Sequence, residues 1–241
     1  MRPLQVTSPA YSQSTEETMA NAFVPSARSK LKRLPKRGHY DRATVYAILD
    51  TGFICHVGYA IDGQPYVTPT AYWREGDAVY WHGSSASRML RTLETGADCC
   101  LTVTHLDGLV LARSAFHHSL NYRSVMLFGK AHKVEDADEK LAKLEAFVAR
   151  LYPDRWRELR PVNAKELKAT TVLGMRIDEA SAKVRTGPPV DDEPDYALPI
   201  WAGVIPVYSV AAAPVDDERL AKSVKMQAAL ADLNHLGLRK G

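Results

Sequence analysis

The alternation of apolar and polar residues between positions 53 and 82 indicates three short antiparallel strands. Apolar side chains recur at about every second position in 53–60, 65–73 and 78–82, which is the period of a strand with one buried face. An Asp-Gly pair at 62–63 and the sequence EGD at 75–77 separate these segments, and such sequences are typical of tight hairpin turns. We therefore expect a three-stranded meander.

Other segments change to helical spacing. The apolar positions in 85–95 repeat every three or four residues, and Gly96 stands where a helix C-cap belongs. Asp41 is the predicted N-cap of an earlier helix that reaches Leu49 and ends at Gly52. Further helices are expected at 137–151, near 163–168 and at 216–234.

The remaining apolar segments predict more strands, joined by short turns. They are 98–105 and 109–115, connected by the sequence LDG, a long strand at 122–133 and a last one at 170–179. A parallel sheet would need a helix at each crossover, and this sequence has too few of them. The pattern favours a mainly β protein with helices, of the α+β class, built on an antiparallel barrel.

The two ends of the chain differ from the middle in composition. We predict a flexible extension over residues 1–36, the barrel domain over 37–210 and a helical tail over 211–241. A basic run at 28–42 is expected to be a solvated leader, with a phosphate or acidic partner as the alternative. An acidic, proline-rich loop follows at 186–199.

Composition and charge exclude several functions. The formal net charge of +3 is too small for the dense basic stripe of a nucleic-acid-binding protein. The three cysteines and the scattered histidines lack the spacing of metal ligands, so no metal site is expected. No apolar stretch is long enough to span a bilayer, and no GxSxG motif indicates a hydrolase. We expect a soluble cytoplasmic protein that binds neither membrane nor nucleic acid.

The sequence HGSSASRML at 82–90 indicates an anion site. The first turn of the predicted helix offers unpaired N–H groups, and Ser84, Ser85 and Ser87 add hydroxyls. Arg88 can meet two phosphate oxygens through its planar guanidinium. The alternative is an ordinary serine-capped helix with a solvated arginine.

Two more segments contain unusual polar groups. Pro69, between Thr68 and Thr70 in YVTPTAYW, cannot donate a ladder hydrogen bond, which predicts a strand edge or bulge with free backbone groups. The alternative is an edge strand protected from aggregation. In FHHSLNYRS at 116–124, adjacent His117 and His118 point in opposite directions on extended backbone, so one of them could face a ligand.

Together these segments resemble a known family. YVTPTAYW, VYWHGSSASRML, DGLVLARSAFHHSLNYRSVMLFGKA and WAGVIP are similar to the pyridoxamine 5′-phosphate oxidase-like FMN-binding split barrels over about residues 37–207. The nearest branch is that of flavin-nucleotide-binding proteins, which includes the nitroimidazole-resistance (Nim-type) proteins. The resemblance implies a six-stranded antiparallel split β-barrel and a homodimer with FMN at the subunit interface.

The same resemblance implies roles for individual residues. Ser87 and Arg88, with Ser84 or Ser85, would hold the FMN phosphate. The isoalloxazine ring would lie against residues of the second strand and the end of the third, and against residues that approach across the dimer interface: Thr68, Pro69, Thr70, Ala71, Trp81 and His82, then His118, Ser119, Asn121, Arg123 and Trp201.

An FMN protein of this kind is expected to pass electrons from NAD(P)H or a similar donor to a small acceptor. The chain has no GxGxxG motif, so a nicotinamide would bind transiently. His82 or His118 could donate a proton, or could only hydrogen-bond the loop. WAGVIPVYSV contains no arginine after its tryptophan, which argues against oxidation of vitamin B6.

Other functions remain open at this point. The chain could be a flavin carrier or sensor without turnover. It could bind haem, with His118 or His82 as axial ligand, or deazaflavin F420, with residues 28–37 as a basic groove.

Overall fold

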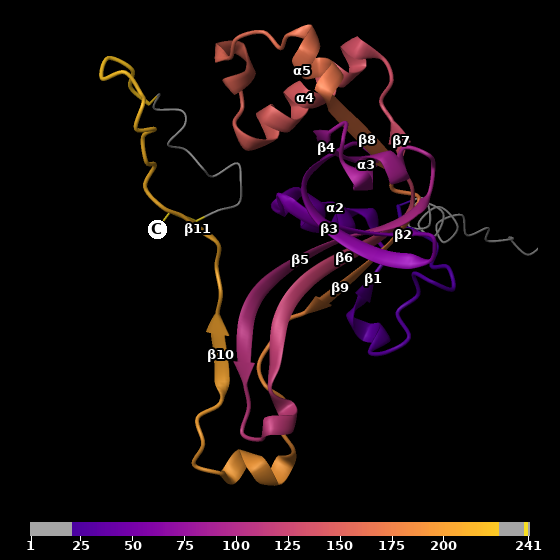
Figure 1. The fold of residues 1–241 in the computed structure, drawn as a ribbon. Coiled ribbons are helices and arrows are strands. Elements are labelled where there is room, and N and C mark those ends of the chain that lie inside the picture. The colour runs from indigo at the N-terminus through magenta and orange to yellow at the C-terminus, as the bar shows by residue number, and fades with distance from the viewer. Residues whose placement is uncertain (1–20, 227–238, 241) are drawn as a thin grey trace, which may run out of the picture.

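A computed structural model of the chain describes residues 21–226, 239 and 240 (Figure 1). Antiparallel strands form a strongly curved sheet with helices at its upper end (Figure 1). The two long strands β5 and β6 extend below this sheet, and we call this extension the arm (Figure 1). The strands are β1 Gly38–His39, β2 Ile54–Ile61, β3 Gln64–Glu75, β4 Ala78–Ser84, β5 Asp98–Leu111, β6 Ser119–Lys130, β7 His132–Lys133, β8 Thr170–Arg176, β9 Glu179–Arg185, β10 Gly203–Pro206, β11 Val210–Ala211 and β12 Arg239–Lys240.

Helices cap the ends and one face of this sheet. The α-helices are α2 Arg42–Thr51, α3 Arg88–Leu93, α4 Ala137–Leu151 and α5 Ala164–Ala169, and the 3-10 helices are η1 Pro35–Arg37, η2 Ala115–His117, η3 Arg155–Glu158 and η4 Glu193–Ala197. Asp41 is the N-cap of α2, as predicted, because its carboxylate accepts a hydrogen bond from the Thr44 N–H at 2.8 Å. The range predicted for α4 is also confirmed.

The barrel is closed by one bent strand. Strands β9, β6, β5, β2, β3, β4 and β8 are hydrogen-bonded neighbours in that order, and every pair is antiparallel. Only two residues separate β8 from β9, so the chain leaves one edge of the sheet and continues on the other. If this bent pair is counted as a single strand, the barrel has six strands. The predicted antiparallel split-barrel architecture is confirmed.

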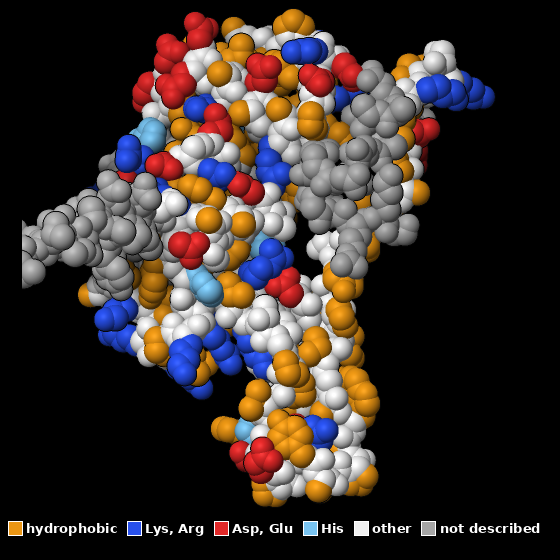
Figure 2. Space-filling model, turned by 180° about the vertical axis from the view of Figure 1, so that it is seen from behind, with side chains coloured by type: hydrophobic (Ala, Val, Ile, Leu, Met, Phe, Trp, Pro, Cys, Tyr) orange, Lys and Arg blue, Asp and Glu red, His pale blue; other side chains and the backbone are white. Residues whose placement is uncertain are grey.

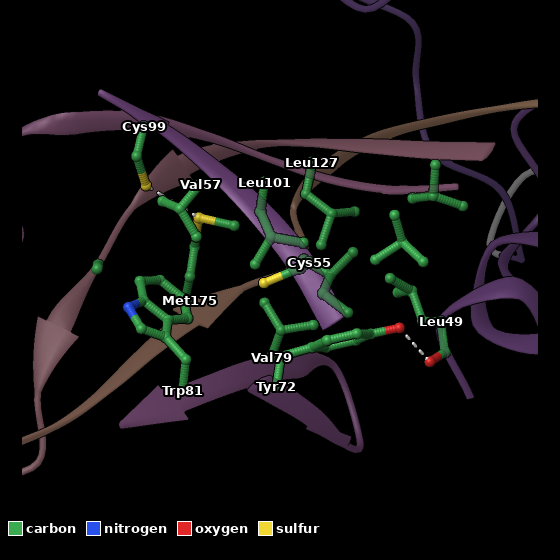
Figure 3. Close-up of a cluster of buried hydrophobic side chains, with 14 of the residues drawn as sticks. Leu49, Cys55, Val57, Tyr72, Val79, Trp81, Cys99, Leu101, Leu127 and Met175 are labelled. Atoms are coloured by element: carbon green, nitrogen blue, oxygen red, sulfur yellow. Dashed lines mark hydrogen bonds between the residues drawn. The ribbon is translucent and has the colours of Figure 1, made fainter. Parts of the chain in front are cut away.

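The interior of the barrel is apolar (Figure 3). Leu101, Leu127 and Val57 point inward from three adjacent strands and are fully buried. Trp81 packs beside Met175, and the Tyr72 hydroxyl donates a hydrogen bond to the Leu49 carbonyl at 2.5 Å (Figure 3). This bond joins α2 to the barrel, so the core holds both sheet and helix in place.

The helix predicted over 85–95 is shorter in the structure. The Ser85 N–H donates to the Ala169 carbonyl and the Ser87 N–H to the Ser84 carbonyl, both at 2.8 Å. These bonds hold residues 84–87 as a turn, and the helix begins only at Arg88.

The two strands predicted at 98–105 and 109–115 are one strand, and the LDG sequence between them is a bulge. The register of β5 with β6 shifts between Leu106 and Gly108, which leaves Asp107 as the extra residue. A side chain at Gly108 would meet Val204 Cγ1 at 3.0 Å, so β10 packs directly against this glycine. The bulge therefore continues β5 into the arm instead of reversing it.

The terminal segments also differ from the sequence prediction. Phe23 is only 4% exposed and joins the core, and Arg28 pairs with Glu179, so residues 21–36 pack on the barrel and are not a free extension. Residues 216–226 form turns instead of the predicted helix, and 227–234 lie outside the described residues. No helix in the described part of the chain is long and apolar enough to cross a membrane.

Candidate cofactor site

Strand β3 has one unpaired edge. It pairs with β2 over residues 64–71, but with β4 only over 72–75, because the two strands diverge beyond Tyr72 and Trp81. No described strand pairs with the other edge of residues 64–71. Pro69 lies within this segment, so the strand edge predicted from the proline is confirmed. The backbone groups on this edge are available to a ligand.

Arg88 stands at the same end of the barrel. Its guanidinium carbon lies 4.3 Å from the centre of the Tyr66 ring, and Tyr66 stacks on Tyr59 with ring centres 5.6 Å apart. The Tyr59 hydroxyl in turn shares a 3.3 Å hydrogen bond with Thr68. This chain of contacts positions the first residue of α3 beside the unpaired edge of β3.

The polar groups around Arg88 remain free. Arg88 is exposed and makes no ion pair or hydrogen bond with any described residue. Ser87 caps α3 without a side-chain hydrogen bond, and the Ser85 hydroxyl also lacks a partner among these residues. The Ser84 hydroxyl accepts a bond from the Ala86 N–H at 3.2 Å. Free hydroxyls beside an unpaired guanidinium are groups that bind a phosphate.

Trp81 and His82 point to opposite faces of β4. Trp81 is buried in the barrel, and its Nε1 has no hydrogen-bond acceptor among the described residues. It therefore supports the core and does not reach the edge of β3. His82 lies across from Ala71, one step beyond the last β3–β4 pair. Its ring packs edge-on against Phe147 of α4, with centres 4.6 Å apart.

Burial lowers the pKa of His82. Its Nδ1 is buried and has no partner among the described residues, so the imidazolium is disfavoured at neutral pH. A neutral, enclosed ring is a poor proton donor.

This burial predicts a pH effect on stability. The unfolded chain takes up the His82 proton near pH ~6.5, whereas the folded chain does so only at lower pH, so the free energy of unfolding should fall as pH decreases below ~6.5. We expect His82→Phe, measured by urea unfolding from about pH 7 to about pH 5, to lose less stability than the wild type. His132→Phe, at an exposed position, is the control. Equal acid sensitivity in wild type and His82→Phe would contradict the assignment.

The other predicted residues lie on the arm. Register pairs Val110 with Ser119 and Gly108 with Asn121, while Leu111 pairs with Gly203, two residues after Trp201. His118, Ser119, Asn121 and Trp201 are therefore together on the arm. Leu127 of β6 aligns with Thr68 through β5 and β2, so His118 is about 30 Å along the strand from the Thr68 row. Within one chain, the arm residues cannot meet the Arg88 site.

Each polar residue on the arm has a different environment. The Asn121 amide donates to the Gly187 carbonyl at 3.1 Å, and its oxygen accepts from Arg185. Arg123 forms two 2.9 Å bonds to Asp107, which neutralises its charge and raises its pKa. These pairs stabilise the arm.

His118 has one ring nitrogen held and the other free. Its Nδ1 lies 2.8 Å from the Ser114 carbonyl, and because a carbonyl can only accept, Nδ1 carries the proton. The side chain is exposed, so in the neutral ring Nε2 offers its lone pair to the surroundings. This is the arrangement found in histidines that bind metals, whose second nitrogen donates to a carbonyl or carboxylate.

A cavity of about 440 Å³ lies where α2 meets the base of the arm. It borders Arg123, and its wall includes His105, whose Nε2 lies 3.0 Å from the Ile48 carbonyl. His105 was not among the residues predicted from the sequence, because the LDG that follows it is typical of a turn. The polar residues Thr104 and Asp107 in an otherwise apolar strand were the available signal.

His117, Asp191 and Asp195 place ligand-type atoms within 4.8 Å of one another near the arm's end. Arg113 already binds both oxygens of Asp191, at 2.9 and 3.0 Å, and His117 bonds Ser114. Arg113 therefore already balances the charge of Asp191.

A profile described as pyridoxamine 5′-phosphate oxidase matches residues 41–184, more than half of the chain. The chain belongs to this family. The match covers the unpaired edge of β3, the Ser84–Arg88 segment and strands β5 and β6 of the arm, but it ends before Trp201.

Two solved structures match this chain over most of its length. The flavocytochrome Anf3 from Azotobacter vinelandii is 51% identical, with a TM-score of 0.83, and the alignment covers 91% of this chain and 100% of that one. The FAD and haem binding protein from Mycobacterium smegmatis is 36% identical, with a TM-score of 0.78, over 81% of this chain and 96% of that one. The family thus includes flavin- and haem-binding proteins.

A more distant match shows the fold alone. A proposed 5-nitroimidazole antibiotic resistance protein from Bacteroides thetaiotaomicron is 23% identical, with a TM-score of 0.50, over 61% of this chain and 86% of that one. No curated protein matches the chain.

Proposed function

We propose that this family member is a redox protein that binds a flavin and a haem. The observation that carries the flavin site is the unpaired Arg88 guanidinium, with free serine hydroxyls, beside the unpaired edge of β3. The flavin- and haem-binding relatives at 51% and 36% identity support both cofactors. FMN and FAD share the phosphate next to the flavin, so the same cradle would hold either one.

Different residues at this edge would contact the phosphate and the ring of the flavin. Arg88, Ser85 and Ser87 would hold the phosphate by charge-assisted hydrogen bonds. Thr68 and Thr70, with the backbone of Ala71, would meet the polar edge of the ring, and Pro69 keeps the strand edge free of a competing donor. A bound flavin supplies hydride and electron transfer, and the protein supplies orientation and hydrogen bonding.

For haem, His118 fits better than His82. Haem iron in many proteins is held by one histidine nitrogen, and the Nε2 of His118 is free while its Nδ1 is fixed by Ser114. Phe116, two residues before His118, is 90% exposed and offers an apolar surface. By contrast, the His82 ring packs edge-on against Phe147, and its Nδ1 is buried.

A homodimer would bring the two halves of the site together. The His118 and Arg88 groups lie too far apart in one chain, and apolar side chains cover the arm (Figure 2). On the barrel, Ile54 and Val67 are 61% and 68% exposed on the outer face of β2 and β3. Large apolar side chains exposed together on one face are typical of a protein interface. An arm of one copy could then reach the β3 edge of the other.

The dimer predicts a specific result in analytical ultracentrifugation. The wild type should sediment with the mass of two chains, and Val67→Glu should shift it toward one chain because a charge would be buried in the interface. Lys168→Glu, on exposed α5, should leave the mass unchanged. A monomeric wild type that still retains flavin would contradict the shared site.

Turnover distinguishes an oxidoreductase from a carrier. We expect NADPH added without oxygen to bleach the flavin absorption, and a small acceptor added in excess to sustain NADPH consumption. Flavin that stays oxidised with NADPH and NADH would contradict the nicotinamide-dependent reaction and favour a carrier.

A further inference from the structure

The N-terminal loop and two strands of the sheet enclose a second cavity, of about 280 Å³. It lies between residues 28–33 and the outer side of β6 and β9. Its wall consists of Arg28, Ser29, Lys30, Leu31, Lys32, Arg33, Ser124, Met126, Ser181 and Lys183. The cavity is lined by five cations and no carboxylate.

Four of these cations are unpaired. Arg28 is neutralised by Glu179, to which it lies at 2.7 Å. The remaining four make no ion pair with any residue that the structure describes: Lys30, Lys32, Arg33 and Lys183. Figure 2 shows Lys and Arg side chains gathered at the lower edge of the barrel, on the side of this loop. An excess of positive charge around a cavity favours an anionic ligand.

The loop that carries these charges is held in place. The Ser26 hydroxyl and Arg28 both bind Glu179 at the start of β9, and the Leu31 N–H donates to the Tyr40 hydroxyl at 2.8 Å. Arg28 also stacks over Phe128 of β6, 5.1 Å from its ring centre. The loop that carries the cations is therefore held over the sheet and is not a free tail.

The floor of the cavity adds a free hydrogen-bond donor. Ser181 is only 5% exposed, yet its hydroxyl has no partner among the described residues. Beside it, the Ser124 hydroxyl donates to the Lys183 carbonyl at 3.3 Å. Leu31 and Met126 form an apolar wall. Cations, an unused hydroxyl and an apolar wall match a phosphorylated molecule with an apolar or aromatic portion.

We propose that this cavity binds the diphosphate of an ADP moiety. A diphosphate concentrates several negative charges on few atoms and can engage all four free cations, as a single carboxylate cannot. The cavity is smaller than typical sites for whole drug-sized ligands, so part of a larger molecule would project from it. The aligned residues Pro69, His56, Thr102, Met126 and Ser181 place the cavity four strands from β3, a path of about 19 Å around the wall of the barrel.

The ADP moiety would belong to a nicotinamide dinucleotide that serves as electron donor, so this inference rests on the proposed redox function. It is not the ADP half of FAD, because the diphosphate of FAD includes the flavin phosphate, which the Arg88 cradle would hold. The cavity is therefore a second phosphate site and not part of that cradle.

Direct binding of ADP and of inorganic pyrophosphate to the purified holoprotein, measured by isothermal titration calorimetry, tests the cavity. We expect both to bind, and each removed cation to weaken binding roughly tenfold. The test variants are Lys30→Gln/Lys32→Gln, at exposed positions, and Lys183→Gln. Lys165→Gln/Lys168→Gln removes the same charge from exposed α5 and should leave binding unchanged. Absence of ADP binding to the wild type, or equal losses in test and control variants, would overturn the proposal.

Two further measurements on the same variants test the electron donor as the source. Flavin content should equal that of the wild type, while the Kd for NADPH should rise. An unchanged Kd for NADPH would contradict the assignment to the donor. Because ADP binding is measured directly, failure of the redox proposal would appear separately, as a protein without flavin or haem.

Discussion

Replacing Arg88 with alanine is expected to weaken flavin binding by about 10- to 150-fold, which corresponds to the roughly 1.5–3 kcal/mol of a charge-assisted hydrogen bond. Flavin fluorescence titrated with apoprotein measures this affinity. The Arg88 guanidinium makes no competing ion pair among the described residues, so its removal leaves no carboxylate unpaired. The substitution should therefore lower flavin affinity with little effect on the stability of the fold.

Two controls separate binding from folding in this experiment. Arg88→Lys keeps the charge without the planar guanidinium and should give an intermediate affinity. Loss of the stacking on Tyr66 should cost only about 0.5–1 kcal/mol of stability at an exposed site, so the apoprotein variants should unfold at nearly the wild-type urea concentration. An Arg88→Ala variant that binds flavin with wild-type affinity would show that the phosphate lies elsewhere.

Replacing His118 with alanine is expected to abolish haem retention while flavin remains bound. His118 is exposed and its Nδ1 is held by Ser114, so its Nε2 would hold the haem iron and its removal would take that nitrogen away. The Soret absorbance relative to flavin absorbance measures the loss. Added imidazole should restore part of the Soret band, because it replaces the missing ligand without changing the protein.

His117→Ala is the matched control for this variant. Its ring is adjacent, but it is half-buried and lies beside Asp191 and Asp195, so the variant should retain haem. If His118→Ala keeps an unaltered Soret band, the axial ligand is another residue, and the same comparison with His82→Ala identifies or excludes the alternative from the sequence.

The sequence predicted most of the barrel because local patterns there agree with the tertiary structure. Asp41 caps its helix, the Asp-Gly pair turns β2 into β3, and Pro69 marks the unpaired edge. The directions of Trp81 and His82 also follow from sequence, since neighbours on a strand face opposite sides. This alternation means that Trp81 and His82 cannot both lie beside the flavin ring, as the resemblance implied.

The arm was not predictable from local sequence. An Asp-Gly pair after Leu106 fits a hairpin turn as well as a bulge, and only the pairing of Gly108 with Asn121 and its packing against β10 decide between them. Strand β9 was missed because Ala180, Ser181 and Ala182 have weak β-propensity. Its pairing with β6 determines its conformation.

The visible absorption spectrum of the purified protein, followed by chromatography of the cofactor released by heat, tests the central claim most directly. The account predicts flavin bands together with a Soret band, and release of FMN or FAD. A colourless protein that takes up neither added flavin nor added haemin would contradict it.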